Sequence, residues 1–397
     1  MTQMEWKTSW SYLPIHYNTC IGTLENVTQR TYFWNNLSGQ KVRVRFSNRY
    51  GTTPLILDHV VLAKQRDVIT DMTQVTYHGE GQIIIPAGKE FYSDEINLPV
   101  TAEEDFVLSI YFKEPVEIRS ACSTWNAQSW HTQYGLGNDY TMKQTFEGKE
   151  SREIYPYVDA DANKANIIAG ICSIQVLTPY DVKTIALFGD SITHMSYYSD
   201  ALMEQLYRAF PERITVINRG IGGNRILHDA TYVPEFDGEG KCFGTAAISR
   251  FEEDVYSFET PDFVFILEGV NDLMHADQFH HPEETVTAKQ LIAGLTLLTL
   301  TAYQRGSKVF LGTVMPFQHE NTIPLPDAEN ERLILNEWIR SQSMTDARLD
   351  FAKLMEDPHH VGYLKDELHI GDGLHPNTLG GHVMAQYVES ILLKYLH

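Results

Sequence analysis

A serine near the middle of the chain has the surroundings of a nucleophile. Residues 184–188 form an apolar run of strand length with β-branched and aromatic members, and Gly189 then breaks this run. From residue 199 onward, apolar residues recur at helical spacing. Open α/β sheets place their chemistry where a buried strand ends and leads toward a helix. Ser191 is therefore our candidate nucleophile, and it needs a base, a group that orients the base, and donors for an oxyanion.

An aspartate and a histidine near the C-terminus could supply the base and its orienting group. Asp372 and His375 are three residues apart, and Pro376 follows them before the last helical pattern. A compact turn with this spacing lets the carboxylate accept a hydrogen bond from one imidazole nitrogen, while the other nitrogen faces a serine. A lone histidine ahead of a helix would be a structural or solvated residue. Together with a strand-end serine, the pair predicts an acyl-transfer site.

Two further strand ends carry residues that could bind an oxyanion. The first is the glycine-rich run 218–225, where glycines allow the backbone to approach a ligand closely. Its spacing differs from that of a dinucleotide-binding loop, and no Gly-Lys-Ser/Thr follows it, so a phosphate-binding loop is not supported. The second is Asn271, after the apolar run 262–267. Its amide could donate to an oxyanion, or the residue could cap a helix.

The positions of these residues predict a parallel sheet covered by helices. Strand-like runs alternate with helical patterns from residue 181 to 397, which predicts an α/β domain with a three-layer α/β/α sandwich. The expected strands are 184–188, 214–218, 262–267, 308–315 and 348–351, and the expected helices are 200–210, 246–257, 284–305, 327–341 and 379–396.

Residues 1–180 instead predict a β-sandwich of the jelly-roll kind. Short alternating or apolar runs follow one another with turn residues between most of them and without a convincing helix. The expected strands are 41–46, 55–63, 83–85, 95–98, 106–112, 116–120 and 166–177. Five of the six tryptophans lie in this part. We expect most of them to fill the core, whereas the polar run 125–131 is the best candidate to border the active site.

Composition limits the partners of this chain of 397 residues. A formal net charge of −21 argues against binding to nucleic acid or to an anionic membrane. The N-terminus lacks the apolar core of a signal peptide, and no stretch has the roughly 18 apolar residues of a membrane span. The four cysteines are scattered without a Cys-x-x-Cys pair. We therefore expect a cytoplasmic protein with reduced thiols, while the oligomeric state stays open.

The four strand-end and turn segments together resemble the ordered blocks of the SGNH (GDSL-type) hydrolase superfamily. These segments are Gly189-Asp-Ser191, Asn218-x-Gly220-x-x-Gly223, Gly269-x-Asn271-Asp272 and Asp372-x-x-His375-Pro. The resemblance covers residues from about 183 to 397, and no Gly-x-Ser-x-Gly elbow of an ordinary α/β-hydrolase is present. The run 43–51 and the sandwich pattern are similar to two-domain, acetylxylan-esterase-like members.

The resemblance implies a flavodoxin-like sheet and a serine ester hydrolase that uses no cofactor and no metal. It implies that Ser191 attacks the ester, that His375 transfers the proton and that Asp372 holds the imidazole. It places the oxyanion between the backbone N–H groups of Ser191 and Gly223 and the side chain of Asn271. The implied substrate is a small ester, such as an acetylated carbohydrate. A lipase, a broad carboxylesterase and a carbohydrate-binding protein with little or no catalysis are the alternatives.

Other polar residues near these segments are assigned supporting positions. We expect Asp190 to make a scaffold hydrogen bond and His194 to lie at the rim of the site. His275, Asp277, His280 and His281 follow Asn271, but their spacing fits no metal-site template. We therefore expect these four residues to lie in a solvated loop over the cleft.

Overall fold

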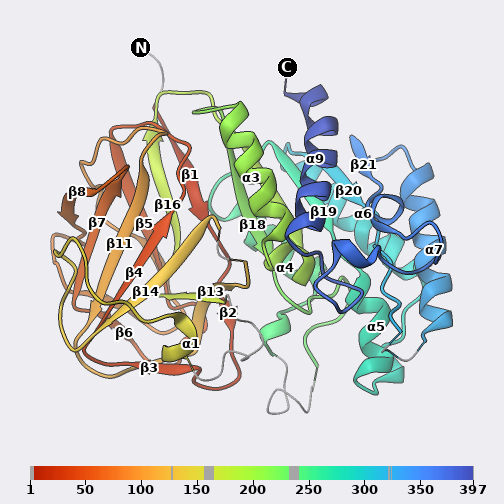
Figure 1. Ribbon diagram of the computed structural model, residues 1–397, viewed down its shortest axis with the longest axis horizontal. Coiled ribbons are helices and arrows are strands. Elements are labelled where there is room, and N and C mark those ends of the chain that lie inside the picture. Colours follow the sequence, from red (N-terminus) through yellow and green to blue (C-terminus); the bar gives the residue numbers. More distant parts are fainter. Residues whose placement is uncertain are drawn as a thin grey trace. The chain divides into compact units, whose positions relative to one another are not determined.

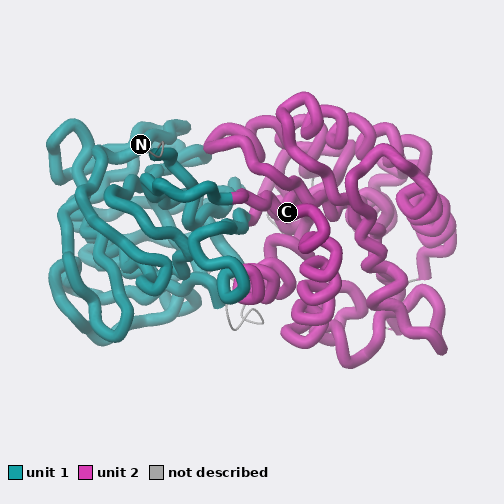
Figure 2. The backbone as a smooth tube through the Cα atoms, turned by 90° about the horizontal axis from the view of Figure 1, so that it is seen from above, with its two compact units in different colours: residues 1–182, 207–217 teal, residues 183–206, 218–397 magenta. Residues whose placement is uncertain are grey.

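The computed structural model describes residues 4–126, 128–155, 165–231, 241–320, 322 and 324–396. The chain divides into two compact units (Figure 2). Unit 1 contains residues 1–182 and 207–217, and unit 2 contains residues 183–206 and 218–397. In the described residues, no helix is long and apolar enough to cross a membrane.

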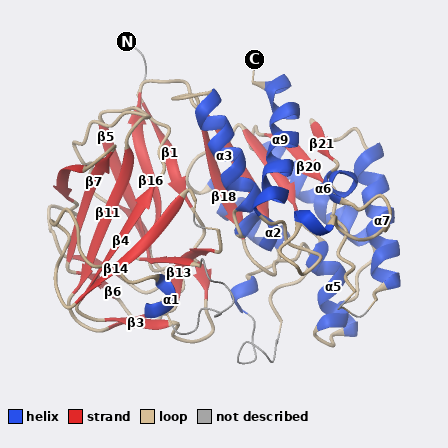
Figure 3. Ribbon diagram, viewed as in Figure 1, coloured by secondary structure: helices blue, strands red, loops and turns tan. Residues whose placement is uncertain are grey.

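Unit 1 is built from antiparallel sheets, as the sequence predicts (Figure 3). A four-stranded sheet has the order β1 (Glu5–Ser11), β16 (Ile171–Thr178), β5 (Lys41–Ser47), β10 (Glu90–Tyr92). A five-stranded sheet has the order β14 (Trp130–Leu136), β4 (Val27–Phe33), β11 (Asp105–Phe112), β7 (His59–Gln65), β8 (Ile69–Gln74). A three-stranded sheet has the order β15 (Asn166–Ala169), β13 (Ser120–Thr124), β2 (Ile15–His16). Two further sheets have two strands each: β12 (Val116–Ile118) with β3 (Gly22–Leu24), and β6 (Leu55–Leu57) with β9 (Ile83–Ile85). One short helix, α1 (Ser151–Ile154), belongs to this unit.

Alternation along the strands explains how this unit buries its core. In β5, Val42, Val44 and Phe46 are fully buried, whereas the basic residues between them are partly exposed. Trp10 and Trp130 are also buried, and their ring centroids lie 5.6 Å apart. Trp10 fills the core, as expected, whereas Trp130 lies in the same core although it belongs to the run 125–131 that is predicted to border the active site.

Four predicted strands in unit 1 have the wrong bounds. The run 116–120 covers β12 and the first residue of β13, which belong to different sheets. The run 166–177 is two strands because Gly170 has φ +87°, and β15 and β16 join different sheets on either side of it. The run 55–63 is divided at Asp58, whose carboxylate accepts hydrogen bonds from Gln82 and from the backbone N–H of Lys113. Residues 95–98 form no strand, although Ile96 makes an isolated bridge to Val42.

The parallel sheet that the sequence predicts lies in unit 2, apart from residues 214–217 of its first strand, which belong to unit 1. Its strand order is β18 (Ile214–Gly220), β17 (Lys183–Gly189), β19 (Phe263–Leu267), β20 (Lys308–Gly312), β21 (Ala347–Leu349). In the register, Gly189 at the end of β17 lies beside Leu267 at the end of β19. Every residue of β19 is buried, which requires a covering layer on each face of the sheet.

Helices supply these two layers. The long helices are α3 (Tyr197–Ala209), α4 (Ala247–Tyr256), α5 (Val270–Gln278), α6 (Ala288–Gln304), α7 (Pro326–Ser341) and α9 (Thr378–Leu392). Figure 1 shows α3 and α9 in front of the strands. They approach closely, because a Cβ at Gly381 of α9 would lie 2.4 Å from the backbone oxygen of Tyr197. On the other side, α4 packs on β17, α6 packs on β20, and α6 contacts both α4 and α7.

The remaining short elements were missed or misplaced by the sequence patterns. The single turns α2 (Ser191–His194) and α8 (Phe351–Met355) follow β17 and β21, and the expected strand 348–351 therefore ends earlier. The predicted helix 284–305 begins only at Ala288, because Thr287 caps it with a hydrogen bond to the N–H of Gln290. Helix α5 includes His275 and Asp277, which are predicted to lie in a solvated loop.

Candidate active site

The candidate nucleophile lies on the turn that leaves β17. Asp190 is the N-cap of α2, and its carboxylate accepts a hydrogen bond from the N–H of Ile192 at 2.9 Å. The scaffold hydrogen bond predicted for Asp190 is therefore confirmed. Ser191 follows as the first residue of the helix and is partly exposed. Gly189 is required before the turn, since a Cβ there would lie 2.6 Å from the backbone oxygen of Leu267.

Ser191, His375 and Asp372 are joined by two short hydrogen bonds. The distance from Ser191 Oγ to His375 Nε2 is 2.7 Å, and the distance from His375 Nδ1 to Asp372 Oδ2 is 2.6 Å. The other carboxylate oxygen of Asp372 accepts hydrogen bonds from the N–H groups of Leu374 and His375, at 3.0 Å each. The C-terminal turn thus holds the imidazole between the serine and the aspartate.

The environment of Asp372 favours its charged form. Burial by itself would raise the pKa of this carboxyl. The hydrogen bond and charge of His375, with the two backbone N–H groups, outweigh burial and lower the pKa to about 2. Asp372 is therefore ionised at neutral pH, and it can accept a hydrogen bond from the N–H at Nδ1 of the imidazole.

The glycine loop lies directly against the turn that carries Ser191. The N–H of Ile221 donates to the backbone oxygen of Gly189 at 3.0 Å. The side chain of Asn218 donates to the backbone oxygen of Thr193 at 2.7 Å. Gly223 has φ +74°, and a Cβ on it would lie 2.1 Å from the ring of Phe243. The backbone at this position therefore requires glycine for two separate reasons.

Asn271 lies in the first turn of α5 and reaches the glycine loop. Its Nδ2 donates to the backbone oxygen of Asn224 at 2.9 Å, and the residue is 5% exposed. The alternative that Asn271 caps the helix is wrong, because Gly269 occupies the N-cap position. The neighbouring Asp272 accepts hydrogen bonds from the N–H groups of Ile226 and Leu227. These contacts tie α5 to the loop that carries Gly223.

A cluster of buried charged residues lies behind these segments, and two of its members were missed in the sequence. Burial raises the pKa of Asp190 to about 7, raises that of Asp272 to about 6, and raises that of Glu268 well above its usual range. Arg250 of α4 contacts Glu268 at 3.2 Å. The only signal for Arg250 in the sequence is that a basic residue lies on the inward face of an amphipathic helix. The only signal for Glu268 is its position at the end of an apolar run.

Two histidine predictions are wrong. His194 is 3% exposed instead of lying at a rim, and its Nδ1 accepts a hydrogen bond from the N–H of Gly222 at 3.0 Å. His275 is 5% exposed on α5 instead of lying in a solvated loop. Burial lowers its pKa to about 3, and its ring lies 5.2 Å from that of Phe243. Within the described residues, no group of three or more His, Cys, Asp or Glu side chains could hold a metal ion.

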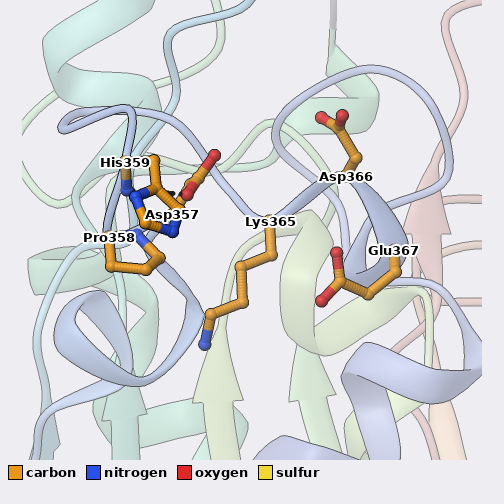
Figure 4. Close-up of a pocket in the computed structure, with 6 residues that line it drawn as sticks. All are labelled: Asp357, Pro358, His359, Lys365, Asp366 and Glu367. Carbon is orange, nitrogen blue, oxygen red and sulfur yellow. Dashed lines mark hydrogen bonds between the residues drawn. The ribbon is translucent and has the colours of Figure 1, made fainter.

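A separate pocket of about 320 Å³ lies in the segment that precedes Asp372 (Figure 4). Its lining residues are Asp357, Pro358, His359, Lys365, Asp366 and Glu367. Figure 4 shows Lys365 between the first three residues and the two acidic residues that follow it. Lys365 Nζ donates to the backbone oxygen of Leu354 at 2.8 Å. None of the predicted site residues lines this pocket.

Comparison with known proteins assigns a family to the segment that carries these strand ends. Residues 187–383 match the model of the GDSL-like lipase/acylhydrolase family. These residues therefore form an acylhydrolase domain of the SGNH (GDSL-type) hydrolases, and the domain is that of a carboxylic ester hydrolase. A comparison with curated proteins finds no significant match.

Solved structures resemble about half of the chain. An acetylxylan esterase from Geobacillus stearothermophilus, solved as a catalytic mutant, has 20% identity and a TM-score of 0.41, covering 53% of this chain and 94% of that one. A GDSL-like lipase from Bacteroides thetaiotaomicron has 19% identity and a TM-score of 0.40, covering 54% and 89%. An α/β hydrolase from the metagenome of Lake Arreo, Spain, has 17% identity and a TM-score of 0.41, covering 53% and 96%.

Proposed function

We propose that Ser191, His375 and Asp372 form a catalytic triad that hydrolyses short acyl esters. The observation that carries this proposal is the pair of hydrogen bonds through His375, 2.7 Å to Ser191 Oγ and 2.6 Å to Asp372 Oδ2. Both distances suit proton transfer between a nucleophile, a base and its orienting group. The membership of residues 187–383 in an acylhydrolase family supports the same chemistry.

In the proposed mechanism, His375 Nε2 takes the proton of Ser191 Oγ while the oxygen attacks the ester carbonyl. Asp372 accepts from Nδ1–H and stabilises the imidazolium that forms. The tetrahedral intermediate then collapses as His375 returns the proton to the leaving alcohol. A water molecule then attacks the acyl carbon while His375 accepts one of its protons. His375 returns this proton to Ser191 Oγ as the bond between that oxygen and the acyl carbon breaks and the acid leaves.

We assign the oxyanion of this intermediate to the backbone N–H groups of Ser191 and Gly223 and to the side-chain amide of Asn271. Asn271 has two N–H bonds on Nδ2, and the backbone oxygen of Asn224 receives one of them. The second is available to the substrate. The close packing of Phe243 on Gly223 favours a small acyl group, because the ring fills space beside the loop.

We propose acetylated carbohydrate as the substrate class, with residues 181–397 as the catalytic domain and residues 1–180 as an accessory domain. An acetylxylan esterase is among the similar structures, and the formal net charge of −21 suits a neutral ester better than an anionic one. We also propose a cytoplasmic location. All four cysteines lie in the described residues and none forms a disulfide, as in reducing compartments.

The test is a chromogenic acetyl ester assay on the wild type, Ser191→Ala and Ser249→Ala. Ser249 is an exposed serine on α4 and serves as the matched control. We expect wild type and Ser249→Ala to hydrolyse the ester and to be labelled once by a serine-directed fluorophosphonate. Ser191→Ala should lose turnover and labelling while keeping its circular dichroism spectrum. Full activity in Ser191→Ala would refute the assignment.

A series of acyl chain lengths on one leaving group tests the substrate class. We expect kcat/KM to be highest for acetyl and to fall as the chain lengthens, and acetylated xylo-oligosaccharides should release acetate. A preference for chains of about eight carbons or more would contradict the short-acyl proposal and would favour a lipase.

A further inference from the structure

Arg250 is a buried arginine to which the proposed chemistry assigns no role. It lies on α4 and is 3% exposed. Its guanidinium stacks 4.0 Å from the centroid of the Phe188 ring in β17. It makes hydrogen bonds or ion pairs to five acceptors: Asn224 Oδ1 at 2.8 Å, the backbone oxygens of Arg219 at 3.0 Å and Gly189 at 3.1 Å, Glu268 Oε1 at 3.2 Å, and Asp254 Oδ2 at 3.3 Å.

Three of these acceptors adjoin the residues that we assign to the oxyanion site. Gly189 is two residues before Ser191. Asn224 follows Gly223, and its backbone oxygen accepts from the side chain of Asn271. Glu268 ends the segment that leads into Asn271. One side chain therefore contacts all three strand ends whose donors must converge on the substrate.

We propose that Arg250 is a positioning residue that sets the spacing of these three strand ends, and hence the geometry of the oxyanion site. This inference rests on the proposed function. Oxyanion donors accelerate a reaction only if they are already aimed at the developing charge. A planar guanidinium with five N–H groups in a rigid fork can hold several acceptors at fixed distances, which a lysine ammonium cannot do. None of the five acceptors of Arg250 is Ser191, His375 or Asp372.

The charge of Arg250 matters as well as its shape. Asp190, Glu268 and Asp272 are all buried behind the site, and each influences the charge of another. Arg250 pairs with Glu268 directly, and its charge opposes the rise in the pKa of Asp190. Among the described residues, the second oxygen of Glu268 has no hydrogen-bond partner. Removing Arg250 alone would leave this carboxyl group buried without compensation.

The test compares Arg250→Lys with Arg332→Lys. Arg332 is a matched control because it is 1% exposed in the same unit and pairs with Glu329 at 2.6 and 2.7 Å. Its other contacts are the backbone oxygen of Val314 and, at 3.8 Å, the carboxylate of Glu356. We expect Arg250→Lys to lower kcat for an acetyl ester by about 10- to 100-fold with KM within threefold, since a misplacement of about 1 Å costs on the order of 100-fold. Arg332→Lys should keep kcat.

A second readout separates positioning from a general loss of stability. A boronic acid that adds to Ser191 forms a tetrahedral adduct and needs the oxyanion donors. Its affinity should fall with kcat in Arg250→Lys and stay unchanged in Arg332→Lys. A purely structural role predicts the opposite: lower melting temperatures for both variants, with kcat and boronate affinity per folded molecule unchanged below the melting range. That result would overturn the inference.

A charge-neutral pair keeps the inference testable if Arg250→Lys does not fold. The double variant Arg250→Gln/Glu268→Gln removes both charges together and retains polar groups that can pair. We expect it to fold and to show the same loss of kcat, whereas Glu268→Gln alone, which keeps an acceptor for Arg250, should lose less than threefold. A double variant with wild-type kcat would refute the proposal. An inactive wild type would instead refute the proposed function and the inference together.

Discussion

Replacing Gly223 with alanine tests whether the glycine loop shapes the oxyanion site. The new Cβ would lie 2.1 Å from a ring carbon of Phe243, whereas ordinary van der Waals contact begins at 3.4 Å. The loop or the ring must therefore move by about 1.3 Å to remove the overlap. The φ of +74° adds a backbone cost of about 1–2 kcal/mol for a residue with a side chain.

This displacement sets the expected loss of activity. The N–H of Gly223 is one of the three donors that we assign to the oxyanion, and losing one such donor costs about 10²–10³ in kcat. We expect Gly223→Ala to lose about that factor for an acetyl ester, with KM changed by less than about threefold. The free energy of unfolding should fall by the backbone cost, plus any cost of moving Phe243.

Two further variants separate the clash from the backbone strain. Gly306→Ala introduces the same kind of strain, because Gly306 has φ +89°, but its Cβ would meet nothing within 4 Å. It should lose stability by about 1–2 kcal/mol while kcat is unchanged. Phe243→Ala removes the obstructing ring. The double variant Gly223→Ala/Phe243→Ala should therefore have a kcat at least about tenfold higher than that of Gly223→Ala. The double-mutant cycle measures this coupling between the two positions. If Gly223→Ala has wild-type kcat, our placement of the oxyanion is wrong.

Two other predictions concern acidic residues of the site. Asp372→Asn should lower kcat by a factor of about 10⁴, because the neutral amide no longer fixes the Nδ1–H tautomer of His375. Labelling of Ser191 by a fluorophosphonate should slow in parallel. An unchanged labelling rate would refute the role of Asp372. Asp190→Asn should reduce the pH dependence of stability. Burial raises the folded pKa of Asp190 from 3.8 to about 7, so its contribution is fully present below about pH 4 and is lost as pH rises through 7. This loss of stability is at most on the order of 4 kcal/mol. Urea unfolding should show a smaller difference in the free energy of unfolding between pH 5 and pH 8 for Asp190→Asn than for wild type. An equal difference in the two proteins would contradict the assignment.

The parallel sheet and the residues at its strand ends could be predicted because their signals are local. A buried parallel strand is a continuous apolar run, and Gly189 and Gly269 mark where two such runs stop. The polar residues that follow, Ser191 and Asn271, must then lie at one edge of the sheet. The turn from Asp372 to His375 is equally local, since the carboxylate contacts the imidazole three residues away.

The missed features depend on contacts between segments far apart in the chain. The role of Arg250 depends on Gly189, 61 residues earlier in the chain. No periodicity in α4 distinguishes it from a surface arginine at the edge of an apolar face. The prediction for His275 is wrong for a related reason. The polar nine-residue helix α5 packs against α7, and its first turn makes hydrogen bonds to residues 224, 226 and 227. The break at Gly170 likewise follows from the pairing of two strands with different sheets.

The charge of Asp372 supports our proposal of a neutral substrate. Burial raises the pKa values of Asp190, Glu268 and Asp272, so these acids carry less negative charge than exposed carboxylates would. Asp372, with a pKa of about 2, adds a full negative charge at neutral pH. An anionic ester would meet this field before it reached the oxyanion donors, whereas an uncharged acetyl ester would not. In the proposed step, the charge of Asp372 also stabilises the imidazolium of His375 after it accepts the serine proton.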